Sequence, residues 1–219
     1  MCGRYALYGP RSRPRGERQY FDGLSDVASS YNVAPSQMMP VSRLMDGEPH
    51  LALAKWGLVP HWTSDPKIGY RMINARSETI ATSKAYGPPY RRKQRCLVPA
   101  SGFYEWKKLP KGKQPYYITS AGGELLAFAG LWEQWKQPDG EWLISYTILT
   151  GEPNQLMRQL HDRMPVILLE EDYERWLRDD DPRDLLAPYP AELLRAYPVS
   201  TRVNSPANND PGLLESLKT

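Results

Sequence analysis

The cysteine that follows the first methionine is the residue of this chain with the most unusual chemistry. Aminopeptidases generally remove Met1 when the next side chain is small, so we expect a mature protein that begins with Cys2. A terminal cysteine is a 1,2-aminothiol, and its α-amine has an ordinary pKa of roughly 7.7 to 8.0, well below that of lysine. The amine would attack an aldehyde, and the adjacent thiol would close the resulting imine to a five-membered thiazolidine. Because Cys2 is also simply a small residue at a start site, the prediction needs support from other groups.

Three further segments carry groups that suit such a reaction. Residues 74–79 combine an amide, a guanidinium and hydroxyls, which fits the orientation of a nucleophile and phosphate binding, or a polar turn that caps a helix. Glu105 lies among aromatic residues at 102–106, where desolvation would raise its pKa and fit it for proton transfer; pairing with a nearby lysine on a solvent-facing strand is the alternative. His161 either interacts with a helix C-terminus or delivers a proton to a sugar oxygen.

The charge of the chain is unevenly divided, although the total is only +3. Residues 1–113 hold 19 Lys and Arg against 8 Asp and Glu, whereas residues 114–219 hold 9 against 17. Aromatic residues lie among the basic ones in the first part, and single-stranded nucleic acid is held by phosphate contacts together with base stacking. An acidic partner such as single-stranded DNA is therefore favoured. The basic clusters are Arg11, Arg13, Arg15 and Arg18; Arg91, Arg92, Lys93 and Arg95; and Lys107, Lys108, Lys111 and Lys113.

The elements that must position these groups are short, because 21 prolines and 16 glycines divide the chain evenly. Aromatic and β-branched runs between turn signals predict strands at 51–56, 97–98, 103–106, 116–119, 125–132 and 142–149. Helices are predicted from Pro153, with Leu156 and Leu160 on one face, and over residues 171–178. The sequence therefore predicts one α+β domain over residues 1–219, built on a curved, mainly antiparallel sheet or barrel with short flanking helices. Its core spans about 2–205, and residues 178–219 are expected to be peripheral.

Several classes of protein are excluded by composition. Two cysteines, one of them at position 2, cannot form a disulfide framework, and Cys96 is expected to be a small buried apolar residue. No apolar stretch is long enough to span a membrane, and the N-terminal residues lack the apolar core of a secretory signal, so we expect a cytoplasmic protein. His50, His61 and His161 form no metal-ligand spacing, so we expect neither a metal nor another cofactor.

Six motifs occur in an order and spacing that resemble the SRAP (SOS response-associated peptidase) family, from Cys2 to beyond Arg202. They are residues 1–4 (MCGR), 31–35 (YNVAP), 56–60 (WGLVP), 74–79 (NARSET), 102–106 (GFYEW) and 161–165 (HDRMP). The resemblance implies the SRAP fold. It also implies an enzyme of the DNA damage response that binds abasic sites in single-stranded DNA. Such an enzyme joins its N-terminal cysteine to the ring-opened deoxyribose aldehyde as a thiazolidine, through lyase-type Schiff base chemistry.

The resemblance also implies roles for individual residues. Cys2 resembles the crosslinked nucleophile, Asn74 the amide that positions its amine, Glu105 the general acid/base and His161 the group that assists ring opening. In family members a second aromatic often follows the position of Trp62, where this chain has Thr63. The expected DNA-binding residues are Gly3, Arg4, Asn32, Pro35, Trp62, Arg76, Thr79, Lys84 and Arg163. We expect a monomer that associates with the nucleoid when it is bound to DNA.

Two other functions remain compatible with the same residues. Cys2, Glu105 and His161 also suit a cysteine-type peptidase, including one that cleaves its own Met1–Cys2 bond, since an N-terminal nucleophile beside an acid/base pair fits autoproteolysis. The third possibility is a non-catalytic single-strand binder in which Cys2 is incidental. Its affinity would fall with salt and would be indifferent both to abasic sites and to Cys2 substitution.

Overall fold

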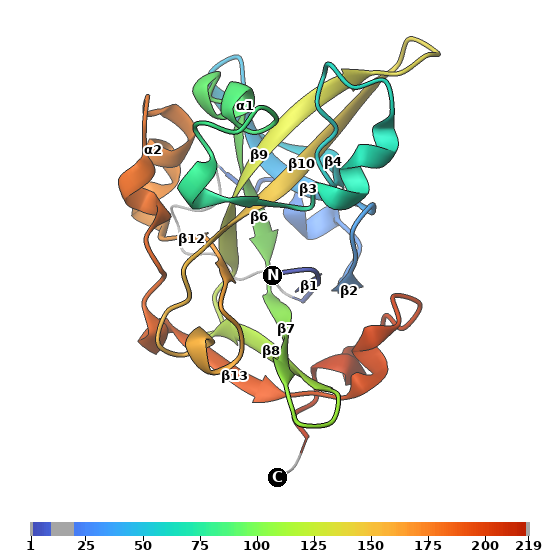
Figure 1. Ribbon diagram of the computed structural model, residues 1–219, viewed down its shortest axis with the longest axis vertical. Coiled ribbons are helices and arrows are strands. Elements are labelled where there is room, and N and C mark those ends of the chain that lie inside the picture. The colour runs from blue at the N-terminus through green and yellow to red at the C-terminus, as the bar shows by residue number, and fades with distance from the viewer. Residues whose placement is uncertain (1, 10–19, 218–219) are drawn as a thin grey trace.

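The computed structural model describes residues 2–9 and 20–217, and a small barrel lies at its centre (Figure 1). The barrel strands follow the order β10-β4-β3-β6-β9, and the circuit closes because β9 also pairs with β10. Neighbours are antiparallel except β4 and β10, which are parallel. The strands span Met38–Met45 (β3), Glu48–Trp56 (β4), Arg95–Ala100 (β6), Leu126–Lys136 (β9) and Trp142–Gly151 (β10). The short strands β5 (Asn74–Arg76) and β11 (Met164–Pro165) pair with β10, and β12 (Ile167–Leu168) pairs with β9.

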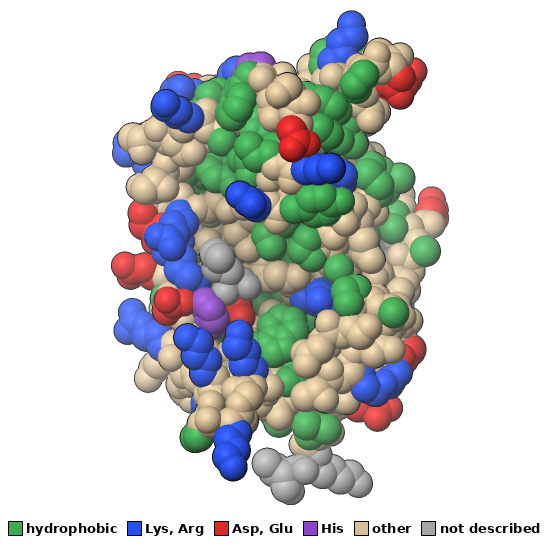
Figure 2. Space-filling model, turned by 45° about the vertical axis from the view of Figure 1, so that its right-hand side comes forward, with side chains coloured by type: hydrophobic (Ala, Val, Ile, Leu, Met, Phe, Trp, Pro, Cys, Tyr) green, Lys and Arg blue, Asp and Glu red, His purple; other side chains and the backbone are tan. Residues whose placement is uncertain are grey.

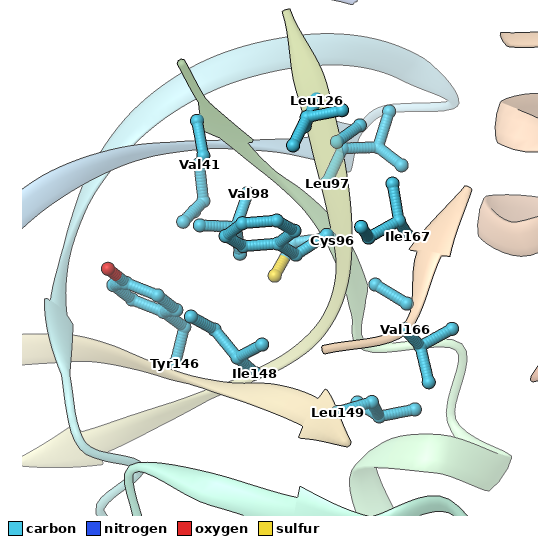
Figure 3. Packing of buried hydrophobic residues seen from close by; sticks show 14 of the residues in the cluster. Val41, Cys96, Leu97, Val98, Leu126, Tyr146, Ile148, Leu149, Val166 and Ile167 are labelled. Atoms are coloured by element: carbon cyan, nitrogen blue, oxygen red, sulfur yellow. The ribbon is translucent and has the colours of Figure 1, made fainter. Parts of the chain in front are cut away.

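Apolar side chains from opposite walls fill the barrel, as Figure 3 shows for Val41, Cys96, Val98, Tyr146 and Ile148. All five are inaccessible to solvent, and burial of each larger side chain contributes about 1.5–3 kcal/mol. The packing leaves no room for a side chain where β9 passes β6, because a Cβ at Gly130 would lie 2.7 Å from Cys96 Sγ. Cys96 is therefore a buried apolar residue of the barrel, as the sequence predicts.

A second sheet, in the order β13-β8-β7-β1-β2, carries the N-terminal strand. Its strands span Tyr5–Leu7 (β1), Ser30–Val33 (β2), Gly102–Lys108 (β7), Lys113–Ser120 (β8) and Leu194–Pro198 (β13). The mixed architecture, with few and short helices, is the predicted α+β fold. All six predicted strands are present in the two sheets, each longer than or as long as the predicted run.

The segment 178–219 differs from the sequence-based expectation that it is peripheral. Strand β13 pairs with β8 over five residues, and the side chains of Val199, Val203 and Leu213 are fully buried in a second apolar cluster with Tyr104 and Tyr117. Prolines and aspartates interrupt this segment so often that its apolar residues show no period. Each becomes buried only through contact with the distant strands β7 and β8.

Of the two predicted helices, one is confirmed. Helix α2 (Tyr173–Arg178) follows a 3-10 turn at Glu170–Asp172, and helix α1 (Gly87–Arg91) is a short addition. The helix predicted from Pro153 is wrong, since only a 3-10 turn at Met157–Gln159 forms. Asn154 anchors this turn, because its side-chain oxygen accepts from Met157 N at 2.9 Å while its amide nitrogen donates to Tyr189 O at 2.7 Å. The turn does not continue as a helix, because Arg163 N donates to His161 Nδ1 at 3.0 Å and not to a carbonyl oxygen one turn earlier. This capped turn then leads directly into the 161–165 segment.

None of the helices within 2–9 and 20–217 has the length and apolar character needed to cross a membrane.

Candidate active site

Pairing between β1 and β7 brings the N-terminal residues beside Glu105. Tyr5 lies opposite Phe103 and Ala6 opposite Gly102, and the ladder continues with a hydrogen bond of 2.9 Å from Tyr104 N to Arg4 O. Extension of this antiparallel register by one more residue places Gly3 opposite Glu105. Cys2 therefore emerges at the same end of β7 as the carboxyl group predicted to assist it.

The Cys2 side chain is completely buried. Its thiol points to the carbonyl oxygen of Arg4, with 3.9 Å between Sγ and the oxygen. Burial, together with the negative charge of Glu105, raises the pKa of the Cys2 thiol to about 12. At neutral pH the sulfur is therefore held as a thiol and not as a thiolate. Met1, whose removal the sequence predicts, lies outside the residues that the structure describes.

Asn74 contacts Cys2 directly. Strand β5 runs parallel to β10, with Asn74 opposite Ile148, and this pairing aims the amide at the N-terminal strand. Asn74 Nδ2 donates to the backbone carbonyl oxygen of Cys2 at 2.8 Å. Asn74 Oδ1 is buried and accepts no hydrogen bond from the described residues. The amide thus fixes the backbone of Cys2 and leaves one buried acceptor next to it.

Glu105 is buried within β7, with only 3% of its surface exposed. Its Oε1 accepts from Trp106 N at 3.2 Å. The negative charge of Glu105 contributes to the raised pKa of the Cys2 thiol, so the two side chains interact electrostatically. The structure therefore brings together three of the four predicted catalytic residues, Cys2, Asn74 and Glu105, from two sheets.

His161 lies in a turn at the edge of this site and is half-buried. Its Nδ1 is 3.0 Å from the backbone nitrogen of Arg163 and 2.8 Å from a carboxylate oxygen of Asp162. In the neutral ring Nδ1 accepts from the Arg163 N–H, so the ring proton is on Nε2; in the charged ring Nδ1 donates to Asp162 instead. The turn thus offers His161 a partner in both protonation states, which suits a group that transfers a proton.

Two cavities flank His161, of about 540 Å³ and 740 Å³. The smaller cavity lies between the end of β7 and the 153–162 turn, and the larger extends toward Arg76 of β5 and Glu78, which follows that strand in the 74–79 motif. Lys108, Pro153, Arg158, His161 and Asp162 line both, so the two are continuous. Trp106, Lys107 and Lys108 of β7 border the smaller cavity together with His161, whereas Cys2, Asn74 and Glu105 line neither cavity.

The larger cavity also contains an ion pair between Glu78 and Arg163. Arg163 donates to both carboxylate oxygens of Glu78, with Nη2 to Oε2 at 2.9 Å, and also to the carbonyl oxygen of Thr150. This hydrogen bonding lowers the pKa of Glu78. Arg163 was predicted to bind DNA, and its guanidinium is instead engaged by a carboxylate that the sequence did not single out.

Arg4 and Asn32 were also predicted to bind DNA, and they lie against each other. Arg4 Nη1 donates to Asn32 Oδ1 at 2.8 Å and to Val203 O at 2.9 Å. Asn32 is 1% exposed, and its amide nitrogen donates to Val203 O, Ser205 O and Asn208 O at 2.7 to 3.3 Å. Asn32 thus ties the 203–208 segment to β2, while Arg4 is half-buried.

The other predicted DNA-binding residues are accessible to different degrees. Trp62, Arg76, Thr79 and Lys84 are exposed, and Gly3 and Pro35 are half-buried. Arg95, from one of the basic clusters, is fully buried and donates to the carbonyl oxygens of Tyr90, Trp176, Asp179 and Asp180. The arginine cluster at 11–18 lies outside the described residues.

The sequence did not single out Arg158 or Glu78 as site residues. Arg158 is an isolated charge in a segment that was predicted to be a helix, so nothing in its surroundings distinguished it from a solvent-facing residue. Glu78 is within the 74–79 motif, and its negative charge was the one feature that could have indicated a partner for a basic site residue. The face shown in Figure 2 carries Lys and Arg side chains along one side and a broad hydrophobic area above them. Among residues 2–9 and 20–217, no group of three or more His, Cys, Asp or Glu is arranged to hold a metal ion.

Comparison with known proteins agrees with this geometry. The sequence model of the SOS response associated peptidase (SRAP) family matches residues 1–206. The abasic site processing protein YoqW of Bacillus subtilis (strain 168) is 45% identical, over 99% of this chain and 100% of that protein. The abasic site processing protein HMCES of Xenopus tropicalis is 34% identical, over 99% of this chain and 78% of that protein.

Solved structures show the same fold. A Bacteroides thetaiotaomicron protein superposes with a TM-score of 0.78 at 28% identity, covering 86% of this chain and 85% of that one. A Bordetella bronchiseptica protein superposes with a TM-score of 0.77 at 30% identity, covering 91% of this chain and all of that one. With its family motifs gathered around Cys2, Asn74 and Glu105, the chain belongs to the SRAP family.

Proposed function

We propose that this protein processes abasic sites in single-stranded DNA by forming a covalent thiazolidine between Cys2 and the ring-opened sugar. The observation that carries the proposal is the convergence of Asn74 and Glu105 on the backbone and thiol of Cys2. The names of relatives at 34% and 45% identity, which describe them as abasic site processing proteins, support the substrate.

The reaction begins once Met1 has been removed. The neutral α-amine of Cys2 adds to C1′ of the sugar aldehyde, and loss of one water gives an imine. The thiol sulfur then adds to the same carbon, the thiol proton passes to the nitrogen, and the ring closes. Aldehyde and aminothiol therefore give thiazolidine and water, with no oxidant, reductant or cofactor required.

Asn74 holds the nucleophile in place for the first step. Its Nδ2 fixes the Cys2 carbonyl group at 2.8 Å, which removes rotation of the residue that carries both reacting groups. Its buried Oδ1 is available as an acceptor for the α-amine. A hydrogen bond accepted from the amine N–H would direct the nitrogen lone pair away from Asn74 and toward the substrate.

Glu105 moves protons for the second step. Because burial keeps the Cys2 sulfur protonated, ring closure requires a group that accepts the thiol proton as the sulfur attacks. Glu105 is the buried carboxylate near enough to act on that sulfur electrostatically. It also serves as the acid that protonates the departing water during imine formation.

His161 assists opening of the sugar ring. The closed form of an abasic sugar becomes an aldehyde only after its ring oxygen gains a proton and its hydroxyl loses one. In the neutral ring described above, His161 carries a proton on Nε2, and its cavity adjoins the end of β7. Lys107, Lys108 and Arg158 line the same space and supply positive charge for the phosphates beside the lesion.

Exposed residues around the site bind the rest of the strand. Trp62 offers a ring for base stacking, while Arg76, Thr79 and Lys84 suit the phosphate backbone. The half-buried Gly3, Arg4 and Pro35 form the floor near Cys2, and Asn32 acts through Arg4. Arg163, which Glu78 holds in this structure, would bind phosphate once that ion pair opens.

The test is incubation of mature protein with an oligonucleotide that contains one abasic site, followed by denaturing electrophoresis. A heat-stable adduct is expected with abasic DNA and not with intact DNA. Cys2→Ala retains an amine and should give only a transient imine, with strand cleavage by β-elimination. Equal, stable adducts from both proteins would show that ring closure through sulfur is wrong.

A cysteine-type peptidase is the second candidate, supported by the family description. Thiolate is the usual nucleophile in such enzymes, and the raised pKa of the Cys2 thiol opposes its formation. Expression without methionine aminopeptidase distinguishes the two, because autoprocessing would make loss of Met1 depend on Glu105 or His161. A mass spectrum of each variant gives the answer.

A further inference from the structure

A second pair of titratable side chains, His61 and Glu133, lies where the turn that carries the exposed Trp62 meets β9. Glu133 is on β9 and is 2% exposed, so its carboxylate is almost wholly removed from water. Its Oε2 lies 3.0 Å from His61 Nδ1, and its Oε1 accepts from Gln94 Nε2 at 3.2 Å. A buried carboxylate is costly unless it is hydrogen-bonded and its charge is balanced. His61 provides one of these hydrogen bonds, and its side chain is 44% exposed at the surface.

The two residues meet because of a tight turn. The turn is closed by a hydrogen bond of 3.0 Å from Thr63 N to Pro60 O, which makes His61 and Trp62 its two central residues. Consecutive residues at a turn point in different directions. His61 is directed at the sheet through its bond to Glu133, while Trp62 is left with 56% of its surface exposed.

The turn is also attached to the sheet on both sides of this pair. Val59 N donates to Ser145 Oγ at 2.8 Å, and Ser145 lies directly opposite Glu133 in the β9–β10 ladder. Trp135, two residues beyond Glu133 and so on the same face of β9, donates its Nε1 to Thr63 O at 2.8 Å. The sheet therefore holds the turn at three successive points, of which His61 is the central one.

The loop that contains Trp62 returns directly to the active site. Leu58 N donates to Met72 O at 3.1 Å and closes the loop just two residues before Asn74. The turn that orients Trp62 is therefore also held in place relative to β5, the strand that carries Asn74. A single exposed aromatic needs no special explanation, but one whose turn is hydrogen-bonded to a buried carboxyl group does.

We propose that His61 and Glu133 are positioning residues that hold Trp62 as a stacking platform for a base of the single strand next to the abasic site. The inference rests on the proposed function, because it assigns a task to the surface beside that site. The pair touches neither the sugar nor Cys2 in this account and acts only through Trp62. Loss of the pair should therefore weaken DNA binding and leave the bond-forming steps unchanged.

The variants are His61→Leu, which removes the bond to Glu133, and His61→Asn, whose amide nitrogen can occupy the place of Nδ1. His61→Leu leaves the buried Glu133 side chain without one of its hydrogen-bond partners, so the double variant His61→Leu/Glu133→Gln replaces the carboxyl group as well and keeps the test valid if the single variant fails to fold. Trp62→Ala serves as the reference. Thermal unfolding of each variant identifies the temperature range in which all are folded.

The first measurement is the abasic-DNA concentration that half-saturates crosslinking, together with the maximal rate. Both His61→Leu and the double variant should raise the half-saturating concentration about tenfold, the size of one lost stacking contact, with a maximal rate within about twofold of the parent. His61→Asn should stay close to the parent. A fall in maximal rate at unchanged half-saturation would overturn the inference.

The second measurement uses an oligonucleotide with 2-aminopurine beside a tetrahydrofuran residue, which has no aldehyde and cannot crosslink. Binding of the parent should change the 2-aminopurine fluorescence, and Trp62→Ala should abolish that change. The double variant His61→Leu/Trp62→Ala should bind the oligonucleotide as tightly as Trp62→Ala alone. Additive losses, or no Trp62-dependent signal, would overturn the inference. Failure of the parent to crosslink genuine abasic DNA would instead overturn the proposed function, and this second measurement does not depend on that reaction.

Discussion

The side-chain nitrogen of Asn74 lies 2.8 Å from the backbone carbonyl oxygen of Cys2, although 72 positions separate the two residues. Parallel pairing of β5 with β10 fixes Asn74, and antiparallel pairing of β1 with β7 fixes the chain next to Cys2. The contact therefore joins the barrel to the second sheet at the reactive residue.

Loss of this contact should slow crosslinking without unfolding the protein. Asn74→Ala removes one hydrogen bond, worth about 0.5–1.5 kcal/mol, so we expect a fall of about three- to tenfold in the rate at saturating DNA. Single-turnover kinetics with abasic DNA measure this rate. Asn74→Asp, which is similar in size but directs a carboxylate at the Cys2 carbonyl, should be at least as slow. An unchanged rate in both variants would contradict the role of Asn74.

The pKa of the Cys2 thiol should fall when Glu105 is replaced by Gln. Burial raises that pKa to about 12, and the charge of Glu105 contributes in the same direction, so its removal stabilises the thiolate. Titration of ¹³Cβ-labelled Cys2 by NMR measures the pKa directly. A pKa that rises or stays unchanged in Glu105→Gln would show that the two groups are not coupled.

The same shift predicts a dependence of stability on pH. The folded-state pKa of about 12 lies above an ordinary thiol value of about 8.5, so the folded protein holds the Cys2 proton more tightly. Its contribution to the free energy of unfolding is complete below pH of about 8.5 and is lost as pH rises toward 12. Denaturant unfolding should show stability falling more steeply over this range in the parent than in Cys2→Ala. Parallel curves would contradict the shift.

Glu78→Gln should strengthen binding to single-stranded DNA. The substitution removes a negative charge that occupies the guanidinium of Arg163 in the larger cavity. We expect a gain of about two- to fivefold at low salt and a steeper dependence of affinity on salt, because Arg163 becomes available to phosphate. Fluorescence anisotropy across a salt series tests this. Weaker binding would indicate that Glu78 holds Arg163 in its productive orientation.

Asn32→Ala should destabilise the fold more than it affects DNA binding directly. Its buried amide bonds three carbonyl groups of the 203–208 segment and accepts from Arg4, so truncation leaves several buried groups unpaired. We expect a loss of about 2–3 kcal/mol in the free energy of unfolding. Urea denaturation gives the value. A near-neutral effect would exclude this anchoring role.

The sequence was informative where chemistry or local pattern is concentrated in a few adjacent residues. Apolar runs between turn signals identified the strands. The position of Cys2 directly after Met1 indicated the aminothiol. It was not informative where a partner distant in sequence decides the outcome. Asn154 is anchored by the distant Tyr189, and Val203 is buried only by the distant second sheet. The pairing of Arg163 with Glu78 is equally invisible before folding.

The most direct test of the account is intact-mass spectrometry of the adduct between the mature protein and an oligonucleotide with one abasic site. The account predicts a species with the summed masses of protein and DNA less one water, formed without a reducing agent and stable to heat, with proteolysis placing the DNA on Cys2. The absence of that species, or its formation to the same extent by Cys2→Ala, would contradict the thiazolidine mechanism.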